Sequence, residues 1–189
     1  MKLRTGLMGA AATLAMAPAA FAERGSDGQL NIIMWQAPTL MHPYLSGGTK
    51  EVIAGSLVLE PLAGYDTEGQ IYARLVTEIP SLENGGIAED LTSVTWKLRD
   101  DVKWSDGTPL TADDVVFTAE YCMDPEGGCA QLAKFEGITA VEAVDPQTVK
   151  VTFDSPRADP FSAFVGSQSP ILQKAQFEAC KGVNAPTCT

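Results

Sequence analysis

Hydrophobic and polar residues follow two different patterns along the chain, and each pattern predicts strands. In the run 94–99, Val-Thr-Trp-Lys-Leu-Arg, apolar and polar residues alternate strictly. This period of two predicts a half-buried strand with Val94, Trp96 and Leu98 facing inward. A nearly continuous apolar run, Leu30–Trp35, instead predicts a strand buried on both faces, as in an α/β sheet.

Helical spacing of apolar residues alternates with these strands. It predicts an amphipathic helix over 51–62, which Pro61 closes. A second helix is predicted to begin after Thr111, because this residue can cap the helix and Asp114 can return the hydrogen bond. Residues 171–180 form a third candidate helix. The buried stripe of the second helix is predicted to consist of Val115, Val116, Ala119 and Cys122.

Turn residues separate these elements. Turns are predicted at Tyr65–Gly69 and Trp104–Pro109, where Asp and Gly occur together. A hairpin is predicted from Val141–Val144 through a turn at Asp145–Gln147 to the strand Val149–Phe153. Strands, helices and hairpins in this order predict a mixed α/β fold.

The first residues have the features of a secretory signal peptide. Lys2 and Arg4 precede an apolar stretch from Leu7 to Ala17, and small residues follow at Ala20-Phe21-Ala22. The apolar stretch is about ten residues long, well short of the roughly 20 that span a bilayer. We therefore expect residues 1–22 to be removed on export and the mature chain not to be embedded in a membrane; an uncleaved membrane anchor is the alternative.

The charge balance argues against nucleic acid as a partner. The chain has 13 basic and 24 acidic residues. Loss of Lys2 and Arg4 with the signal peptide leaves 13 − 2 = 11 basic residues, and 11 − 24 gives a formal charge of −13. Such a surface repels nucleic acid and anionic lipid. Acidity alone does not identify a ligand, because it also serves solubility.

No pattern in the sequence predicts catalysis, a cofactor or a metal site. The single histidine, His42, has neither a nucleophile nor an acidic residue beside it, so it is interpreted as a loop residue. Gly-x-Ser-x-Gly, His-Glu-x-x-His and Gly-Lys-Ser/Thr motifs do not occur. The acidic run 100–107 lacks the alternating carboxylates and terminal Glu of an EF-hand loop and is interpreted as solvated turns.

The four cysteines, Cys122, Cys129, Cys180 and Cys188, occur late in the chain. An exported protein can form disulfides, and four cysteines allow three pairings. The turn-rich segments between them favour the two local pairs, Cys122 with Cys129 and Cys180 with Cys188. Zinc binding is the alternative, but neither pair has the spacing of a zinc knuckle.

One long segment resembles a known family. The stretch 95–118, TWKLRDDVKWSDGTPLTADDVVFT, is similar to the signature of the family 5 extracellular solute-binding proteins, the oligopeptide- and dipeptide-binding group. The segments 59–66 and 141–156 support the resemblance, which extends over essentially the whole mature chain.

The resemblance implies the N-terminal part of a class II periplasmic-binding-protein-like fold, in which two lobes enclose a ligand. It implies a binding protein and not an enzyme, one that captures peptides in the periplasm and delivers them to an inner-membrane ABC permease. Some members take nickel complexes, opines or sugars instead, and a secreted domain without a role in transport is a further alternative. The expected organisation is a signal peptide over 1–22, the start of the first lobe over 23–59, an extra subdomain over 60–170 and a truncated return segment over 171–189.

The ligand is expected at the end of the first predicted strand, because ligands of open α/β sheets gather at strand ends. The loop of Trp35, Gln36, Ala37, Pro38 and Thr39 leaves the strand at this point. Its backbone could bind an extended peptide, and the ring of Trp35 could either cover a ligand or pack in the core.

Overall fold

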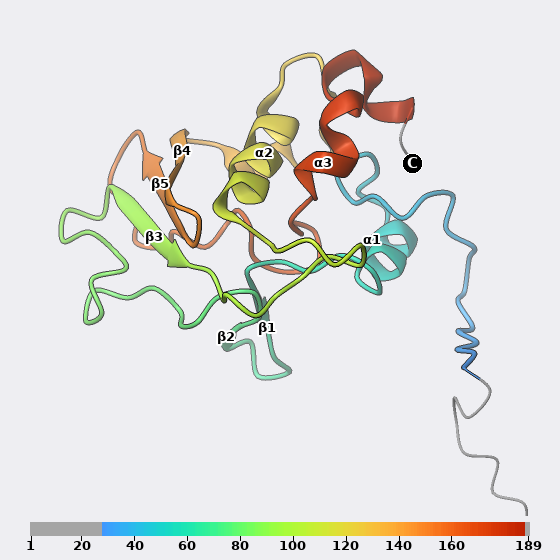
Figure 1. Ribbon diagram of the computed structural model, residues 1–189, viewed down its shortest axis with the longest axis horizontal. Coiled ribbons are helices and arrows are strands. Elements are labelled where there is room, and N and C mark those ends of the chain that lie inside the picture. Colours follow the sequence, from blue (N-terminus) through green and yellow to red (C-terminus); the bar gives the residue numbers. More distant parts are fainter. Residues whose placement is uncertain (1–27, 188–189) are drawn as a thin grey trace, which may run out of the picture. The chain divides into compact units, whose positions relative to one another are not determined.

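The computed structural model describes residues 28–187, and the chain divides into two units at Met34 and Trp35. Every helix and strand of the described residues lies in the second unit (Figure 1). In chain order these are α1 (Thr49–Gly55), β1 (Ala63–Tyr65), β2 (Ile71–Ala73), β3 (Ser93–Lys97), α2 (Ala112–Met123), β4 (Ile138–Asp145), β5 (Thr148–Phe153) and α3 (Lys174–Phe177). Short 3₁₀ helices occupy Leu132–Phe135, Glu178–Cys180 and Gly182–Thr187.

The predicted strand Leu30–Trp35 is wrong. Residues 28–34 form no helix or strand, and the side chain of Ile33 is 100% exposed. A strand buried on both faces needs hydrogen-bonded neighbours and a layer on each side. Within the described residues no strand pairs with this run, so its hydrophobicity alone does not make it a strand.

The main sheet has three antiparallel strands in the order β3-β5-β4. In its register Val94 pairs with Val151 and Trp96 with Val149. Val94, Trp96 and Leu98 are buried, which confirms the inward face predicted from the alternating pattern. The predicted hairpin is also present and joins β4 to β5 through a tight turn, where the Asp145 carboxylate accepts a hydrogen bond from the Gln147 N–H (2.8 Å).

Helix α2 begins where the sequence predicts and packs against the sheet. Thr111 is its N-cap, and the Asp114 carboxylate accepts a hydrogen bond from the Thr111 N–H (3.0 Å), as a capping box requires. The Ala112 N–H donates to the Pro146 carbonyl (2.8 Å), which ties the start of α2 to the hairpin turn. Of the predicted stripe, Val115, Ala119 and Cys122 are buried and Val116 is half-buried.

The predicted helix 51–62 is shorter than expected. Helix α1 ends at Gly55, and the apolar residues Ile53 and Leu57 of the predicted range are exposed. Tertiary pairing draws the following residues out of the helix: the Leu62 N–H donates to the Phe164 carbonyl (2.9 Å), and the Glu60 carbonyl accepts from Ile171 (2.8 Å). The chain then turns back on itself through the β1–β2 hairpin, whose connection contains the predicted turn.

The C-terminal helix also begins later than predicted. Ile171 and Leu172 are buried but lie outside any helix or strand, and the Leu172 N–H donates to the Thr118 hydroxyl of α2 (2.9 Å). This contact holds the segment against α2, and helical structure starts at Lys174. A 3₁₀ turn ending at Cys180 follows.

One of the two predicted disulfides is present. Cys122 at the end of α2 is bonded to Cys129, with 5.0 Å between the Cα atoms. The other predicted pair includes Cys188, which lies outside the described residues. That pair stays a prediction.

The predicted signal peptide, residues 1–22, also lies outside the described residues. Over 28–187, the chain has no helix with the length and hydrophobicity needed to cross a membrane.

Candidate functional site

The loop predicted to contact a ligand begins the second unit. Trp35, Gln36 and Ala37 are exposed, with 72% of Trp35 accessible, and Pro38 is half-buried. Trp35 is therefore not packed in the core of the described residues. Its ring is free for contact with a ligand or with further polypeptide.

The far end of this loop is held by a buried carboxylate that the sequence analysis did not single out. Both the N–H and the hydroxyl of Thr39 donate to Oε1 of Glu51 in α1 (3.1 and 2.8 Å). Lys50 lies 2.6 Å from the same oxygen, and this ion pair is the main cause that lowers the pKa of Glu51 to about 2. The loop is thus tethered to α1 at its Thr39 end.

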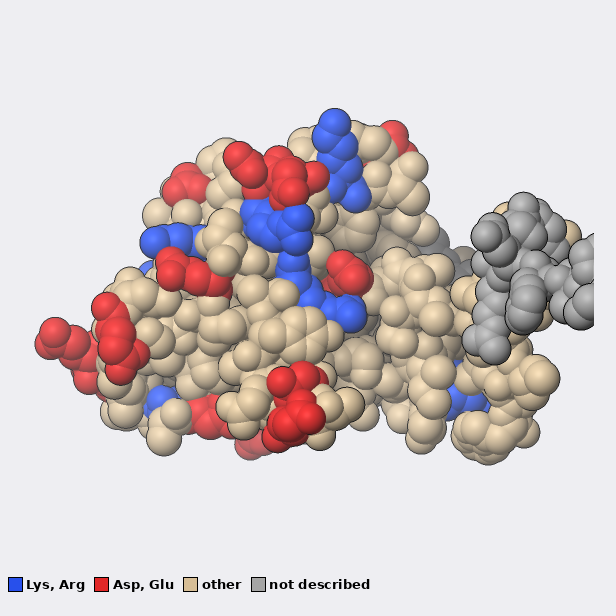
Figure 2. Space-filling model, turned by 90° about the horizontal axis from the view of Figure 1, so that it is seen from below, with Lys and Arg blue, Asp and Glu red and all other residues tan. Residues whose placement is uncertain are grey.

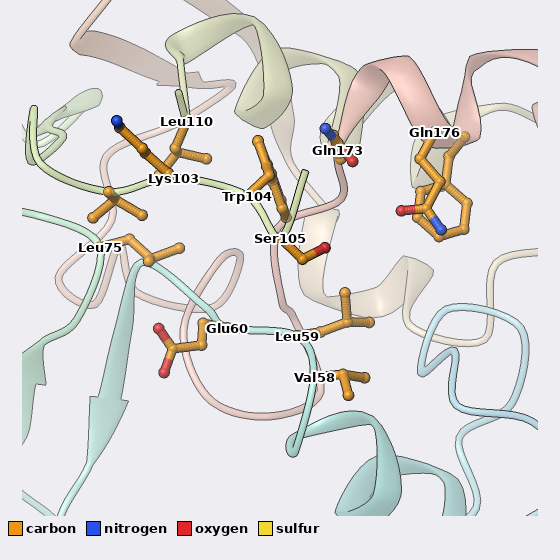
Figure 3. A pocket seen from close by; sticks show the side chains of 12 residues that line it. Val58, Leu59, Glu60, Leu75, Lys103, Trp104, Ser105, Leu110, Gln173 and Gln176 are labelled. Atoms are coloured by element: carbon orange, nitrogen blue, oxygen red, sulfur yellow. The ribbon is translucent and has the colours of Figure 1, made fainter. Parts of the chain in front are cut away.

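A groove lies between three segments that are distant in the sequence. Figure 3 shows its first hollow, of about 190 Å³, walled by Val58 and Leu59 after α1, Trp104 and Ser105 before α2, and Gln173 and Gln176 of the C-terminal segment. A second hollow of about 420 Å³ is lined by Met41, His42, Val58, Leu59, Ser105, Gln176 and Phe177. The two hollows share Val58, Leu59, Ser105, Gln176 and Phe177, and together we call them the α1–α3 groove.

Hydrogen bonds fix the α3 side of this groove. The amide of Gln173 donates to the Asp106 carboxylate (2.7 Å) and to the Thr108 hydroxyl (3.1 Å). The Lys174 N–H donates to Asp114 of α2 (2.9 Å). Hydrogen bonds from Thr108, and then from Gln173, lower the pKa of Asp106. The predicted turn at 104–109 therefore positions the C-terminal segment.

His42 lines the second hollow, and its burial is not predicted from the sequence. The imidazole is 2% exposed, stacks on Tyr121 (5.4 Å between ring centroids) and meets the edge of Phe177 (5.1 Å). Neither ring nitrogen has a hydrogen-bond partner among the described residues. Burial lowers the pKa of His42 to about 4, so the ring is neutral at pH 7.

His42 lies in a loop, as predicted, but its burial does not follow from the sequence. The adjacent Pro43 and the following glycines indicate a turn, and a turn residue is usually solvated. Tyr44 is a local neighbour of the ring, but Tyr121 and Phe177, which lie closer to it, are far along the chain. No local pattern could have revealed these two contacts.

The lining of the groove is mixed in chemistry. It combines apolar side chains with a neutral imidazole, amides, a hydroxyl and the charged side chains of Glu60 and Lys103. The described residues contain no group of three or more His, Cys, Asp or Glu placed to hold a metal ion.

On the face shown in Figure 2, acidic side chains gather toward the sheet, while fewer charged side chains lie toward α1.

Comparison with known proteins identifies the family. The family described as bacterial extracellular solute-binding proteins, family 5 Middle, matches residues 74–187. The Glutathione-binding protein GsiB of Escherichia coli (strain K12) is 29% identical over 163 residues, which are 86% of this chain and 29% of GsiB.

Solved structures give the same fold. OppA of Haemophilus influenzae, in complex with RPPGFSPFR, matches 76% of this chain and 30% of its own with a TM-score of 0.66 and 24% identity. NikZ of Campylobacter jejuni, in complex with Ni(L-His), matches 67% of this chain and 24% of its own with a TM-score of 0.57 and 29% identity. The chain thus spans less than a third of the proteins that it matches.

These matches confirm the resemblance and the mixed α/β fold of the periplasmic-binding-protein type. They also confirm that the chain belongs to a class of solute-binding proteins and not to a class of enzymes. The chain belongs to the family 5 bacterial extracellular solute-binding proteins.

Proposed function

We propose that this chain is the N-terminal part of the periplasmic solute-binding component of an ABC importer that captures di- and oligopeptides. The similarity to GsiB over 86% of the chain carries the proposal, because glutathione is itself a small peptide. The complex of OppA with a peptide supports the same class of ligand. In this role the signal peptide 1–22 directs export, and the loaded protein meets an inner-membrane permease.

The proposed organisation assigns the start of the first lobe to 23–59, the extra subdomain to 60–170 and a return segment to 171–189. The ligand contact proposed for this part is the loop Trp35–Thr39. Its exposed indole offers a flat apolar surface, and its anchor at Glu51 keeps the loop in place. Aromatic walls and backbone hydrogen bonds are the usual means of holding an extended peptide.

A non-peptide ligand is the second candidate. NikZ, at 29% identity, binds a nickel complex of histidine, and an opine or a sugar belongs to the same alternative. The present loop supplies an indole and backbone groups and does not by itself select among these ligands.

Calorimetry on two proteins tests the proposal. The first is this chain after signal removal. The second carries the same residues joined to the rest of the two-lobed fold, from a continuing reading frame or from GsiB. Each is titrated with glutathione, a mixed di- to pentapeptide library and Ni(L-His). Since one lobe leaves the ligand exposed, we expect micromolar peptide binding only by the longer protein.

Micromolar binding by the short chain would contradict the need for two lobes. Binding of Ni(L-His) without peptide binding would replace peptides by the second candidate. Replacing Trp35 by Ala in the longer protein should weaken peptide binding, and an unchanged affinity would remove this loop from the site.

A further inference from the structure

A buried turn lies between the loop Trp35–Thr39 and α1 in the chain. We call residues 42–45 the 42–45 turn. The Leu45 N–H donates to the His42 carbonyl (3.0 Å), and the first three residues of the turn are buried. Only two residues separate the turn from Thr39. Because so short a link transmits a displacement, the position of the turn constrains the end of the proposed ligand loop.

The end of α2 makes one set of contacts with this turn. Tyr121 stacks on the His42 ring, with 5.4 Å between the ring centroids, and its ring lies 6.4 Å from that of Tyr44. The next residue along α2 is Cys122, which is buried and bonded to Cys129. These aromatic contacts therefore come from the residue next to the disulfide.

The segment that begins at Cys129 makes a second set of contacts. The Ala130 N–H donates to the Tyr44 carbonyl (2.8 Å), and the side-chain amide of Gln131 donates to the Pro43 carbonyl (3.3 Å). Gln131 is 7% exposed, so loss of its hydrogen bond leaves a buried carbonyl without this donor. These hydrogen bonds come from the two residues that follow the disulfide.

The residues between the two cysteines form a link that allows many conformations. After Met123, the last residue of α2, the sequence is Asp-Pro-Glu-Gly-Gly, in which no helix or strand forms. Gly128 has a φ of 60°, a conformation that glycine adopts readily. The disulfide closes this link, with 5.0 Å between the Cα atoms of the two cysteines. It therefore limits how far the end of α2 and the segment 129–131 can separate.

We propose that the Cys122–Cys129 disulfide positions the proposed ligand loop. By keeping the end of α2 and the segment 129–131 together, it maintains both sets of contacts with the 42–45 turn, and the turn holds the Thr39 end of the loop. Glu51 tethers the same end from α1. The role in solute binding rests on the proposed function, whereas the effect on the turn does not.

A disulfide that only stabilises the fold is the alternative. In that case the bond acts mainly by restricting the unfolded chain, and the folded protein is the same with or without it. The two roles therefore differ in the folded state. Positioning predicts a change at the 42–45 turn and in solute affinity under conditions where the protein without the bond is fully folded.

NMR spectra of this chain after signal removal test the effect on the turn. The unchanged chain is compared with Cys122→Ala/Cys129→Ala at a temperature where urea titrations show both to be folded. We expect the ring signals of His42, the single histidine, to shift. The Ala130 N–H should exchange at least about tenfold faster relative to the amides of β5, the central strand of the main sheet. An equal acceleration at Ala130 and in β5 would show that the bond acts on global stability alone and would overturn the proposal.

A pair of glutamine variants tests the hydrogen-bonded contact while the disulfide is intact. Gln131→Met keeps the length of the side chain but removes the amide that donates to Pro43. Gln70→Met makes the same change at an exposed position between β1 and β2. We expect only Gln131→Met to shift the His42 signals. No shift in Gln131→Met, or equal shifts in the two variants, would show that the segment 129–131 does not hold the turn. This comparison decides the point even where the double cysteine variant does not fold.

Calorimetry on the longer protein tests the effect on binding. The titrant is the di- to pentapeptide library prepared without cysteine, so that no added thiol reduces the bond. We expect the double cysteine variant to bind about three- to tenfold more weakly, because the loop occupies its binding position for a smaller fraction of the time. Adding Trp35→Ala should then cost less affinity than it does with the bond intact, since both changes act on the same loop.

These outcomes separate the inference from the proposed function. An unchanged affinity of the folded double cysteine variant, or strictly additive losses on adding Trp35→Ala, would contradict positioning of the loop. A longer protein that binds no peptide would contradict the proposed solute, and the same comparison would then use Ni(L-His). The exchange of the Ala130 N–H and the His42 signals decide the effect of the disulfide on the turn in either case.

Discussion

Asp114 and His42 are both polar side chains buried in the second unit, 6% and 2% exposed, but their surroundings are opposite. The Asp114 carboxylate accepts hydrogen bonds from the indole N–H of Trp104 (3.3 Å), the backbone of Thr111 (3.0 Å) and the backbone of Lys174 (2.9 Å). His42 has none within the described residues. The first region completes its hydrogen bonds within this chain, and the second does not.

The difference follows from where the partners lie in the sequence. Trp104 and Thr111 are close to Asp114 in the chain, so a turn and a helix cap bring two of its three partners together. His42 is buried by aromatic rings from distant segments, and aromatic rings satisfy burial but not hydrogen bonding. Burial of a polar side chain by itself therefore does not show that its hydrogen bonds are satisfied.

The largest effect is expected from removing the hydrogen bonds that Asp114 accepts. Asp114→Ala should lower the free energy of unfolding by about 3 kcal/mol, because it leaves several buried donors without an acceptor. Asp113 is the adjacent exposed carboxylate, and Asp113→Ala should cost less than about 1 kcal/mol. Urea denaturation of both variants measures this. Equal losses would show that the hydrogen bonds of Asp114 contribute nothing beyond helix charge.

The disulfide at the end of α2 is the next test of this region. Replacing Cys122 and Cys129 together by Ala should lower stability by about 2.5 kcal/mol, because the bond closes a short loop in the unfolded chain. Denaturation midpoints of the oxidised protein and the double variant give the value. Peptide mapping under non-reducing conditions identifies the bond, and a link from Cys122 to Cys180 would contradict it.

The buried ring of His42, which has no hydrogen-bond partner within the described residues, should make the free energy of unfolding depend on pH. Because burial lowers the pKa of His42 from 6.5 to about 4, the unfolded chain takes up a proton on this ring at a higher pH than the folded chain. The neutral ring of His42 therefore contributes fully to the free energy of unfolding above pH 6.5, and this contribution is lost as the pH falls toward 4. We expect a loss of about 2 kcal/mol between about pH 7 and about pH 4.5.

His42→Phe is the control for this dependence. It keeps an aromatic ring between Tyr121 and Phe177 but removes the titrating group. Its stability should change little over the same pH range, which urea titrations at a series of pH values measure. A slope equal to that of the unchanged protein would assign the effect to carboxylates instead.

The smallest expected effect concerns the helix cap that helps to hold Asp114. Thr111→Ala should cost about 1 kcal/mol, whereas Thr111→Ser should retain most of the stability because it keeps a capping hydroxyl. Thermal unfolding of the two variants distinguishes them. If serine is as damaging as alanine, the side chain of Thr111 acts through packing.

The site could be predicted only in part. The loop Trp35–Thr39 was located from its place after an apolar run, and its contact with a ligand stays a prediction. The anchoring of this loop at Glu51 was not foreseen, because a glutamate in the first turn of a helix is usually solvated. The α1–α3 groove could not be inferred at all, since its walls include Leu59, Ser105 and Gln176, each more than 40 residues from the next.

Local patterns in the sequence determined the elements whose cause is local. The alternation around Trp96, the turn at 104–109, the cap at Thr111 and the hairpin at Asp145 were all predicted, because pleat, turn chemistry and capping act over a few residues. Tertiary structure decided the rest. The apolar run at 30–35 is not a strand, since a strand requires neighbours that its own sequence does not contain. Helix α1 ends early because the residues after it pair with 164–171, and two of the rings that pack on His42, Tyr121 and Phe177, lie more than 70 residues away. Long-range contacts set these features, and a pattern confined to a short window does not include them.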